Sequence, residues 1–325
     1  MADIIINNIS YTVIDTKEKM TVADSFVKRS NKIMTGNGEA KFYVGNDNDE
    51  IRDFFGNPGF KNKCFILKKD LEQYLKDAEA EYKNPQQPYR NKIQLPEFWK
   101  QRVLLISALP SILWFELNEQ TQIAGSRIYV KSVSPAYELI RELSLPFITY
   151  LSAIKLKAEN GELVYYFRLF VDYFGESEHP GEVEEEVEKI NEEKIPDEVK
   201  KQIQYARVGQ GRYRKALLDE CPFCPITLVS DDRLLIASHI KPWVVSPDDE
   251  KTNPKNGFMF TPTYDFLFDR GFISFTDDKR MLVSPWLSKM TCSKLNIADD
   301  KRFNLLPTEG REYYLEYHRN NVFKS

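Results

Sequence analysis

The stretch LLIASHIKPW, Leu234–Trp243, decides the fold of the last third of this 325-residue chain. Its mostly apolar residues run directly into Ser238 and His239, and Pro242 then ends the pattern. A short apolar run that stops before a proline is typical of a buried strand followed by a loop. His239 therefore stands at the end of a predicted strand, in a chain that contains only three histidines.

The segment that follows predicts a loop, a strand, a helix and a hairpin, in that order. Residues 241–255 are polar and contain three prolines, which favours a loop. NGFMF is apolar enough for a second strand. Thr261, Pro262 and Gly271 are placed to cap, begin and end a short helix. FISF and MLVS flank TDDKR, which indicates a hairpin.

Two carboxylates mark the predicted helix. Asp265 and Asp269 are four residues apart, so both side chains fall on one face. Like charges at this spacing repel each other unless a positive group lies between them. A hard divalent cation bound by carboxylate oxygens would meet that need. A surface helix with one carboxylate as a cap or paired to Arg270 is the alternative that spacing alone leaves open.

ASHIKPW, followed by NGFMFTPTYDFLFDRGFISF, resembles the HNH nucleases, particularly the group that includes restriction enzymes. RVGQGRYRKALLDE, CPIT at Cys224–Thr227 and YLEYHRNNVFK are similar to the flanking segments of that group. The resemblance covers about the last third of the chain. It implies a ββα-metal fold that hydrolyses phosphodiester bonds in double-stranded DNA with a histidine base and one divalent metal ion.

The resemblance also assigns roles to individual positions. His239 matches the general base, and Asn256 matches the asparagine that pins the loop holding that base. Asp265 follows Asn256 by nine residues and takes the place of a metal ligand, while Asp269 lies where some members have a further ligand. Ser238 departs from the pattern, because many members carry a ligating Asp or His there. We therefore expect one Mg²⁺ or Mn²⁺ ion per active site, bound with modest affinity.

Phosphodiester chemistry explains why these residue types occur together. The attacking water must lose a proton while it faces the phosphorus atom. A neutral imidazole can accept that proton near pH 7 because its pKa is about 6.5. A divalent cation stabilises the charge that develops on the transition state and the leaving oxygen. A single histidine at a strand end is usually structural, but the ordered set of His239, Asn256 and Asp265 favours catalysis.

Several basic residues are candidates for contacts with DNA phosphates, and exposed cations in surface ion pairs are the alternative for each of them. These candidates are Arg207, Arg212, Arg214, Lys241 and Arg270. Cys221 and Cys224 have the spacing of half a zinc site. A closed site needs two more ligands, so we favour apolar packing of these cysteines over a structural Zn²⁺ ion.

The rest of the chain predicts an α+β protein with two domains. Residues 1–174 mix expected strands with expected helices and form a mixed α/β domain for recognition of a DNA target or for regulation. Residues 175–204 are dominated by Glu and Asp and are predicted to be a linker or a solvated helix. Residues 205–325 form the predicted HNH nuclease domain.

Particular segments support the mixed class of the first domain. Strands are expected at residues 41–45, 126–133 and 162–174, which are rich in aromatic and β-branched residues. Helices are expected at residues 69–82 and from Pro135 behind the cap residue Ser134. Pro110 interrupts the apolar run around it, so a single long helix is excluded there.

Composition bounds the environment and the partners. The net charge is −4, without the basic tail that would by itself indicate nucleic-acid binding, although local patches can still bind DNA. No apolar run is long enough for a membrane span. The acidic start of the chain is unlike a secretory signal, and four unevenly spaced cysteines do not suggest a disulfide framework. We expect a cytoplasmic protein without a membrane partner.

Three functions remain open at this point. The leading hypothesis is a restriction endonuclease whose first domain reads a DNA sequence or a modified base, and a palindromic target would imply a homodimer. The alternative is a defence-type effector nuclease of low sequence specificity, whose first domain senses a small molecule or a protein. A DNA-binding module with a relic site is disfavoured, because His239, Asn256 and Asp265 are all present.

Overall fold

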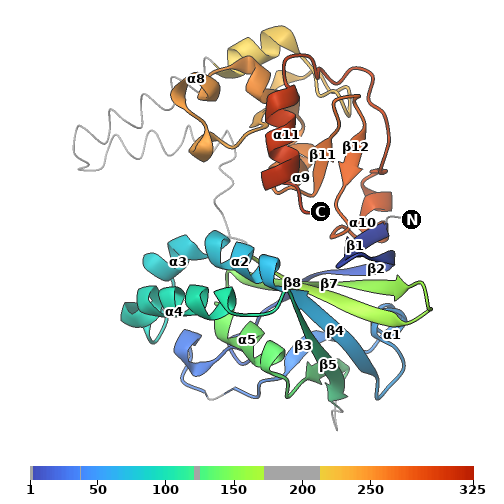
Figure 1. Cartoon of the computed structure of the whole chain (residues 1–325). Coiled ribbons are helices and arrows are strands. Elements are labelled where there is room, and N and C mark those ends of the chain that lie inside the picture. Colours follow the sequence, from blue (N-terminus) through green and yellow to red (C-terminus); the bar gives the residue numbers. More distant parts are fainter. Residues whose placement is uncertain (1–2, 37, 121–124, 172–212) are drawn as a thin grey trace. The chain divides into compact units, whose positions relative to one another are not determined.

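The computed structural model describes residues 3–36, 38–120, 125–171 and 213–325. The chain divides into two compact units, Met1–Phe174 and Gly175–Ser325, and each is described by itself (Figure 1). Both units contain helices and strands, so the predicted α+β class is confirmed. The predicted acidic segment, residues 175–204, lies outside the described residues.

In the described part of the first unit, eight strands form one sheet in the order β1-β2-β7-β8-β4-β5-β6-β3 (Figure 1). Neighbouring strands are antiparallel, except that β4 and β8 run parallel. Their bounds are β1 Asp3–Ile6, β2 Ile9–Thr21, β3 Phe42–Asn46, β4 Lys61–Leu67, β5 Ile112–Gln120, β6 Arg127–Lys131, β7 Thr149–Ala158 and β8 Leu163–Val171. The strands predicted at residues 41–45, 126–133 and 162–174 are therefore confirmed as β3, β6 and β8.

The helices of this unit follow the predicted pattern with one difference. They are α1 Asp49–Phe55, α2 Lys68–Asp77, α3 Glu79–Lys83, α4 Leu95–Ser107 and α5 Pro135–Leu143, with 3-10 turns η1 Arg29–Asn31 and η2 Lys92–Gln94. The single helix predicted over residues 69–82 is wrong, because it divides at Ala78. The Ala78 amide donates to carbonyls two and four residues back, and its backbone is αR with ψ near zero, so the first helix closes there.

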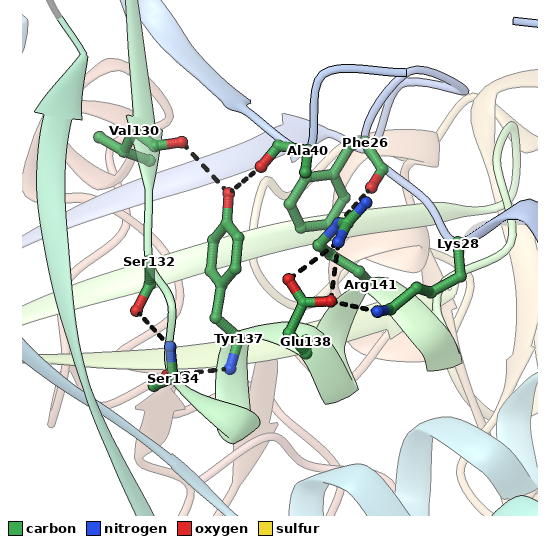
Figure 2. A network of polar contacts seen from close by, with 9 residues as sticks. All are labelled: Phe26, Lys28, Ala40, Val130, Ser132, Ser134, Tyr137, Glu138 and Arg141. Atoms are coloured by element: carbon green, nitrogen blue, oxygen red, sulfur yellow. Dashed lines mark hydrogen bonds and ion pairs between the residues drawn. The ribbon is translucent and has the colours of Figure 1, made fainter. Parts of the chain in front are cut away.

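Helix α5 shows how this unit is held together (Figure 2). Ser134 caps it as predicted, with Oγ accepting from Tyr137 N at 3.2 Å. The Tyr137 hydroxyl donates to Ala40 O at 2.8 Å, and Arg141 Nε donates to Phe26 O at 2.8 Å. Burial alone would raise the pKa of Glu138, but hydrogen bonds from Lys28 and Arg141 hold it below its usual range. The network ties α5 to segments that are distant in sequence, so it fixes the tertiary fold.

The second unit contains the predicted succession of strand, loop, strand, helix and hairpin. Strand β9 Ile236–His239 pairs antiparallel with β10 Gly257–Phe260, with Gly257 opposite His239. Helix α9 Pro262–Asp269 follows, and then the hairpin of β11 Ile273–Phe275 and β12 Met281–Val283. The remaining elements are a helix over residues 213–220, η3 Asp232–Leu234, η4 Trp243–Val245, α8 Asp248–Lys251, η5 Pro254–Asn256, α10 Lys289–Lys294 and α11 Glu312–Asn321.

Aromatic packing fixes the position of α9. All four residues of β10 are buried, and Phe258 and Phe260 pack against Phe268 with ring centroids 5.9 and 5.4 Å apart. Gly271 ends the helix as predicted, at a φ of +69°, and a Cβ there would lie 2.0 Å from Val322 O. Thr261 occupies the N-cap position, but its side chain makes no capping hydrogen bond. The predicted helix is confirmed, whereas the predicted side-chain cap is wrong.

Candidate active site

His239 lies at the end of β9 with its ring partly exposed. The ring stacks on Tyr213, with centroids 4.1 Å apart and an interplanar angle of 15°. Trp243 meets the imidazole edge-on, at 5.4 Å and 82°. On its remaining edge, Nε2 lies 3.0 Å from the carbonyl oxygen of Lys251. The side chain is therefore confined by two rings and one hydrogen bond while some of its surface stays accessible to water.

The hydrogen bond to Lys251 determines the protonation of the neutral ring. A carbonyl oxygen only accepts, so His239 Nε2 must carry the hydrogen and Nδ1 keeps its lone pair. Burial lowers the pKa of His239, although the Lys251 carbonyl and the charge of Asp269 oppose that change. The imidazole is thus neutral near pH 7. A neutral ring with an unprotonated Nδ1 can accept a proton from a water molecule.

Asn256 is completely buried and closes the loop that carries Lys251. Its Oδ1 accepts from Lys241 N at 2.8 Å. Its Nδ2 donates to Lys241 O at 3.2 Å and to Glu250 O at 3.3 Å. Both ends of the amide are therefore used to hold the backbone between β9 and β10. This geometry is what the predicted loop-pinning role requires.

Helix α9 directs Asp265 and Asp269 toward the end of β9. Burial raises the pKa of Asp265 to about 6, against a hydrogen bond from Ser238 that lowers it, and the neighbouring Asp269 raises it further. The pKa of Asp269 is also raised, because protein atoms displace water around the carboxylate even though its side chain keeps exposed surface. The charges of Arg270 and His239 oppose that rise. Asp269 therefore interacts electrostatically both with Asp265 and with His239.

The chemistry of this carboxylate pair fits a divalent cation. Two hard oxygen donors lie on one helix face, and burial is the largest cause that raises the pKa of each carboxyl. Within the residues that the structure describes, however, no group of three or more His, Cys, Asp or Glu side chains converges on one metal-sized position. Asp265 and Asp269 could hold an ion only with oxygen atoms from water or substrate completing its shell.

The basic residues predicted to contact phosphate have varied surroundings. Arg214 donates to Leu235 O at 2.6 Å. Lys241 is buried, pairs with Glu250, and lies over the Tyr313 ring at 5.3 Å. Arg270 lies over the ring of Phe266 at 5.5 Å. Arg207 and Arg212 lie outside the described residues. Arg214 and Lys241 are engaged within the protein instead of standing free, and contacts of all five with DNA stay predictions.

Cys221 and Cys224 are both buried and are not joined by a disulfide. The Cys221 thiol donates to Phe223 O at 3.2 Å, and burial raises its pKa. Cys224 packs in the hydrophobic core of the unit, against the apolar side chains around β10. Buried thiols that form no disulfide pack as small apolar side chains, which is the role that the sequence favoured.

Some residues that shape the site were missed by sequence reasoning. Tyr213, which stacks on His239, lies in the quoted segment RYRKALLDE but received no role. Arg311 is fully buried and donates from Nε to Gly257 O at 3.0 Å, while its Nη2 meets Glu220 at 2.9 Å. No local sequence signal indicates these contacts, because each joins segments at least 25 residues apart.

Comparison with known proteins finds one family that resembles part of the chain. A family model described as HNH endonuclease matches residues 224–276. The match includes β9, β10, α9 and β11, and the resemblance inferred from the sequence is thereby confirmed for this segment. The C-terminal part of the chain therefore contains a segment that matches the HNH endonucleases, and this match supports a nuclease of the hydrolase class. No curated protein matches the chain. Among the described residues, no helix is both long and apolar enough to cross a membrane.

Proposed function

We propose that the chain is a metal-dependent endonuclease of double-stranded DNA, with His239 as the general base and one Mg²⁺ or Mn²⁺ ion per active site. The observation that carries the proposal is the hydrogen bond from His239 Nε2 to the Lys251 carbonyl. It leaves an unprotonated Nδ1 on a neutral ring, beside a helix that bears two carboxylates with raised pKa values. The HNH match over residues 224–276 agrees with this chemistry.

Each of these side chains has a separate role in hydrolysis. His239 Nδ1 accepts the proton of the attacking water, while the Lys251 carbonyl holds the opposite edge of the ring. Asp265 and Asp269 would hold the cation, which when bound supplies electrostatic stabilisation of the developing negative charge. Ser238 orients Asp265 through its hydrogen bond. Asn256 keeps the loop closed so that the Lys251 carbonyl stays in place.

We further propose that Met1–Phe174 supplies target selection, as in a restriction endonuclease. Contacts with the phosphate backbone position a nuclease but do not identify a sequence, so a separate reader is needed. The first unit has its own sheet and its own core, which suits an independent recognition task. A palindromic target would be served by a homodimer. We also propose that the protein acts in the cytoplasm, because its four unevenly spaced cysteines do not suggest a disulfide framework.

The test is to incubate the purified full-length protein with supercoiled plasmid and Mg²⁺, and to repeat it with EDTA. Discrete fragments that disappear with EDTA are expected. A metal-dependent smear would instead support the low-specificity effector, and cleavage of methylated plasmid only would support a modification-dependent enzyme. Cleavage that persists unchanged in EDTA would contradict the proposed role of the metal ion. Asp265→Ala is the matched variant, since it should remove cleavage together with its Mg²⁺ dependence.

A further inference from the structure

Tyr213 contacts His239 from outside the segment that matches the HNH family model, residues 224–276. Its side chain is buried, with 1% of its surface exposed. Its ring is nearly parallel to the imidazole at 4.1 Å. Its hydroxyl donates to Asn256 O at 2.9 Å and lies 3.4 Å from Ser238 O. One residue thus touches the proposed base, the backbone of β9 beside it and the backbone of η5 just before β10.

The close approach of Tyr213 explains why glycine follows Asn256. A Cβ added at Gly257 would lie 1.8 Å from the Tyr213 hydroxyl oxygen and 2.9 Å from Cζ. The Gly257 backbone is extended, at a φ of −169°, so its conformation does not require glycine. Glycine is required instead by the space that Tyr213 occupies and by the Ser238 carbonyl oxygen, which would lie 2.8 Å from the added Cβ. The Asn-Gly pair therefore combines a loop-pinning amide with a position that admits the tyrosine.

The contacts of Tyr213 and Lys251 restrain different motions of the imidazole. Rotation about the terminal bond of a histidine side chain has broad, shallow minima, so an isolated ring would sample many orientations. The stacked face of Tyr213 confines the plane of the ring. The Lys251 carbonyl then selects which edge points toward the loop. Together these two contacts fix the direction in which Nδ1 of His239 points.

We propose that Tyr213 is a positioning residue that fixes the ring of His239, with Gly257 kept small to admit it. The proposal rests on the proposed function in one respect, that an oriented Nδ1 serves catalysis. The geometric part is independent of activity. Misplacement of a reacting group by about 1 Å can lower a rate about 100-fold, so orientation of the base has a measurable kinetic consequence.

The direct experiment is NMR of the histidine rings in the full chain, which has only three histidines. His239→Gln identifies the His239 signals by their loss. In the parent protein these protons should be shifted upfield by the Tyr213 ring, and the ¹⁵N shifts should report a proton on Nε2. Tyr213→Leu should move the proton signals downfield, mix the two tautomers and slow cleavage about 10-fold to 100-fold. Tyr213→Phe keeps the ring and should stay within about threefold of the parent rate.

Two further variants guard the experiment against a simple folding defect. Phe303→Leu removes another ring from the same core, where it packs against Phe275 at 6.4 Å, and should leave the His239 signals unchanged. Gly257→Ala should displace Tyr213 and reproduce the effect of Tyr213→Leu. Adding Tyr213→Phe to Gly257→Ala removes the atom at 1.8 Å but leaves Cζ at 2.9 Å and Ser238 O at 2.8 Å, so it should restore part of the His239 signature. If Tyr213→Leu does not fold, the proposal is tested by comparing Gly257→Ala with the double variant that also carries Tyr213→Phe.

The outcomes separate the two proposals. Unchanged His239 shifts and tautomer in folded Tyr213→Leu, or in Gly257→Ala, overturn the positioning role. Altered His239 signals with an unchanged cleavage rate also overturn it, because the orientation would then serve no catalysis. If the parent protein does not cleave DNA with any divalent metal, or if His239→Gln cleaves at the parent rate, the proposed function fails while the NMR result still stands.

Discussion

Two histidines in the second unit have nearly the same local contacts and different chemistry. His239 stacks on Tyr213 at 4.1 Å, and His318 of α11 stacks on Phe268 at 3.9 Å. Each places Nε2 3.0 Å from a backbone carbonyl, that of Lys251 or that of Phe268. The aromatic stack and the carbonyl therefore do not by themselves make a catalytic residue.

The difference lies at Nδ1 and in exposure. His318 Nδ1 lies 2.9 Å from Ser274 Oγ, and only 1% of the residue is exposed. Burial lowers its pKa to about 4. His239 is partly exposed, and among the described residues the only partner seen for its ring nitrogens is the Lys251 carbonyl at Nε2. A catalytic base needs one ring nitrogen held and the other left for water, whereas a structural histidine has both nitrogens occupied.

The comparison predicts its largest effect at His239. His239→Ala should lower the rate of DNA cleavage by about 10²-fold to 10⁴-fold, because it removes the general base. The stability of the unit should change much less, since the ring is partly exposed. Initial rates on plasmid at saturating Mg²⁺ measure the effect, and binding of a DNA duplex by the variant is the control. Loss of both DNA binding and cleavage would indicate that His239 has a structural role, as His318 does.

His318→Gln should give the opposite result, a large change in stability. The folded pKa of about 4 lies below the ordinary value of 6.5, so the unfolded chain binds more protons between these values. Neutral His318 therefore contributes stability above pH 6.5 that is lost as the pH falls toward 4, on the order of 3 kcal/mol. The Gln variant should lack this pH dependence.

Hydrogen exchange of the α9 and α11 amides across that pH range measures this effect locally, which avoids assuming one transition for two units. At pH 7 the Gln variant should exchange faster, because it loses the stack on Phe268. An unaltered pH profile of exchange in the variant would show that His318 does not control the acid sensitivity of this unit.

Much of this contrast could be predicted from the sequence, and the reasons are local. The order β9, loop, β10, α9 follows from apolar runs, prolines and one glycine within a single segment of about 40 residues. The spacing of Asp265 and Asp269 places them on one helix face by geometry alone. The ordered motif also singled out His239 and Asn256, whose surroundings in the structure suit the roles expected of them.

Other features could not be predicted, because they depend on contacts between distant segments or on backbone atoms. The tautomer of His239 is fixed by the backbone carbonyl of Lys251. Every residue type has a backbone carbonyl, so the sequence does not indicate this contact. Tyr213 is 26 residues before the histidine that it stacks on. Lys241 has the charge of a phosphate contact, but the fold buries it against Glu250. Ala78, where the expected helix divides, is buried in the core of the first unit, and nothing in the local sequence marks it as a helix end.

Asp265→Asn should raise the stability of the metal-free protein while it lowers the rate of DNA cleavage. The pKa of Asp265 is raised from 3.8 to about 6, so the ionised carboxylate disfavours the folded state above pH 6. In metal-free protein at pH 7 the Asn variant should therefore be more stable, by on the order of 2 kcal/mol, and the gain should vanish below about pH 4. Hydrogen exchange of the α9 amides in EDTA at pH 4 and pH 7 measures the difference locally.

The same variant should cleave DNA poorly, because an amide is a weaker ligand than a carboxylate for a hard cation. Adding Mg²⁺ should stabilise the parent protein and stabilise the Asn variant less. Asp269→Asn is the matched control, with the same direction and a smaller gain, because that side chain keeps more contact with water. A loss of metal-free stability in Asp265→Asn at pH 7 would contradict the desolvated carboxylate.

The smallest effect on the rate of DNA cleavage is expected at Lys241. This residue belongs to the loop that holds His239, and His318 has no corresponding loop. Its ammonium pairs with Glu250, and that hydrogen bond is the main cause of its raised pKa. Lys241→Met should loosen the neighbouring Lys251 carbonyl and slow cleavage less than about tenfold, well below the effect of removing the base. DNA affinity measured against salt concentration should keep its slope, whereas a phosphate contact would reduce that slope by about one. A smaller salt dependence of DNA affinity in the variant would indicate that Lys241 contacts a DNA phosphate, as the sequence suggested. Its ion pair with Glu250 would then be replaced when DNA binds.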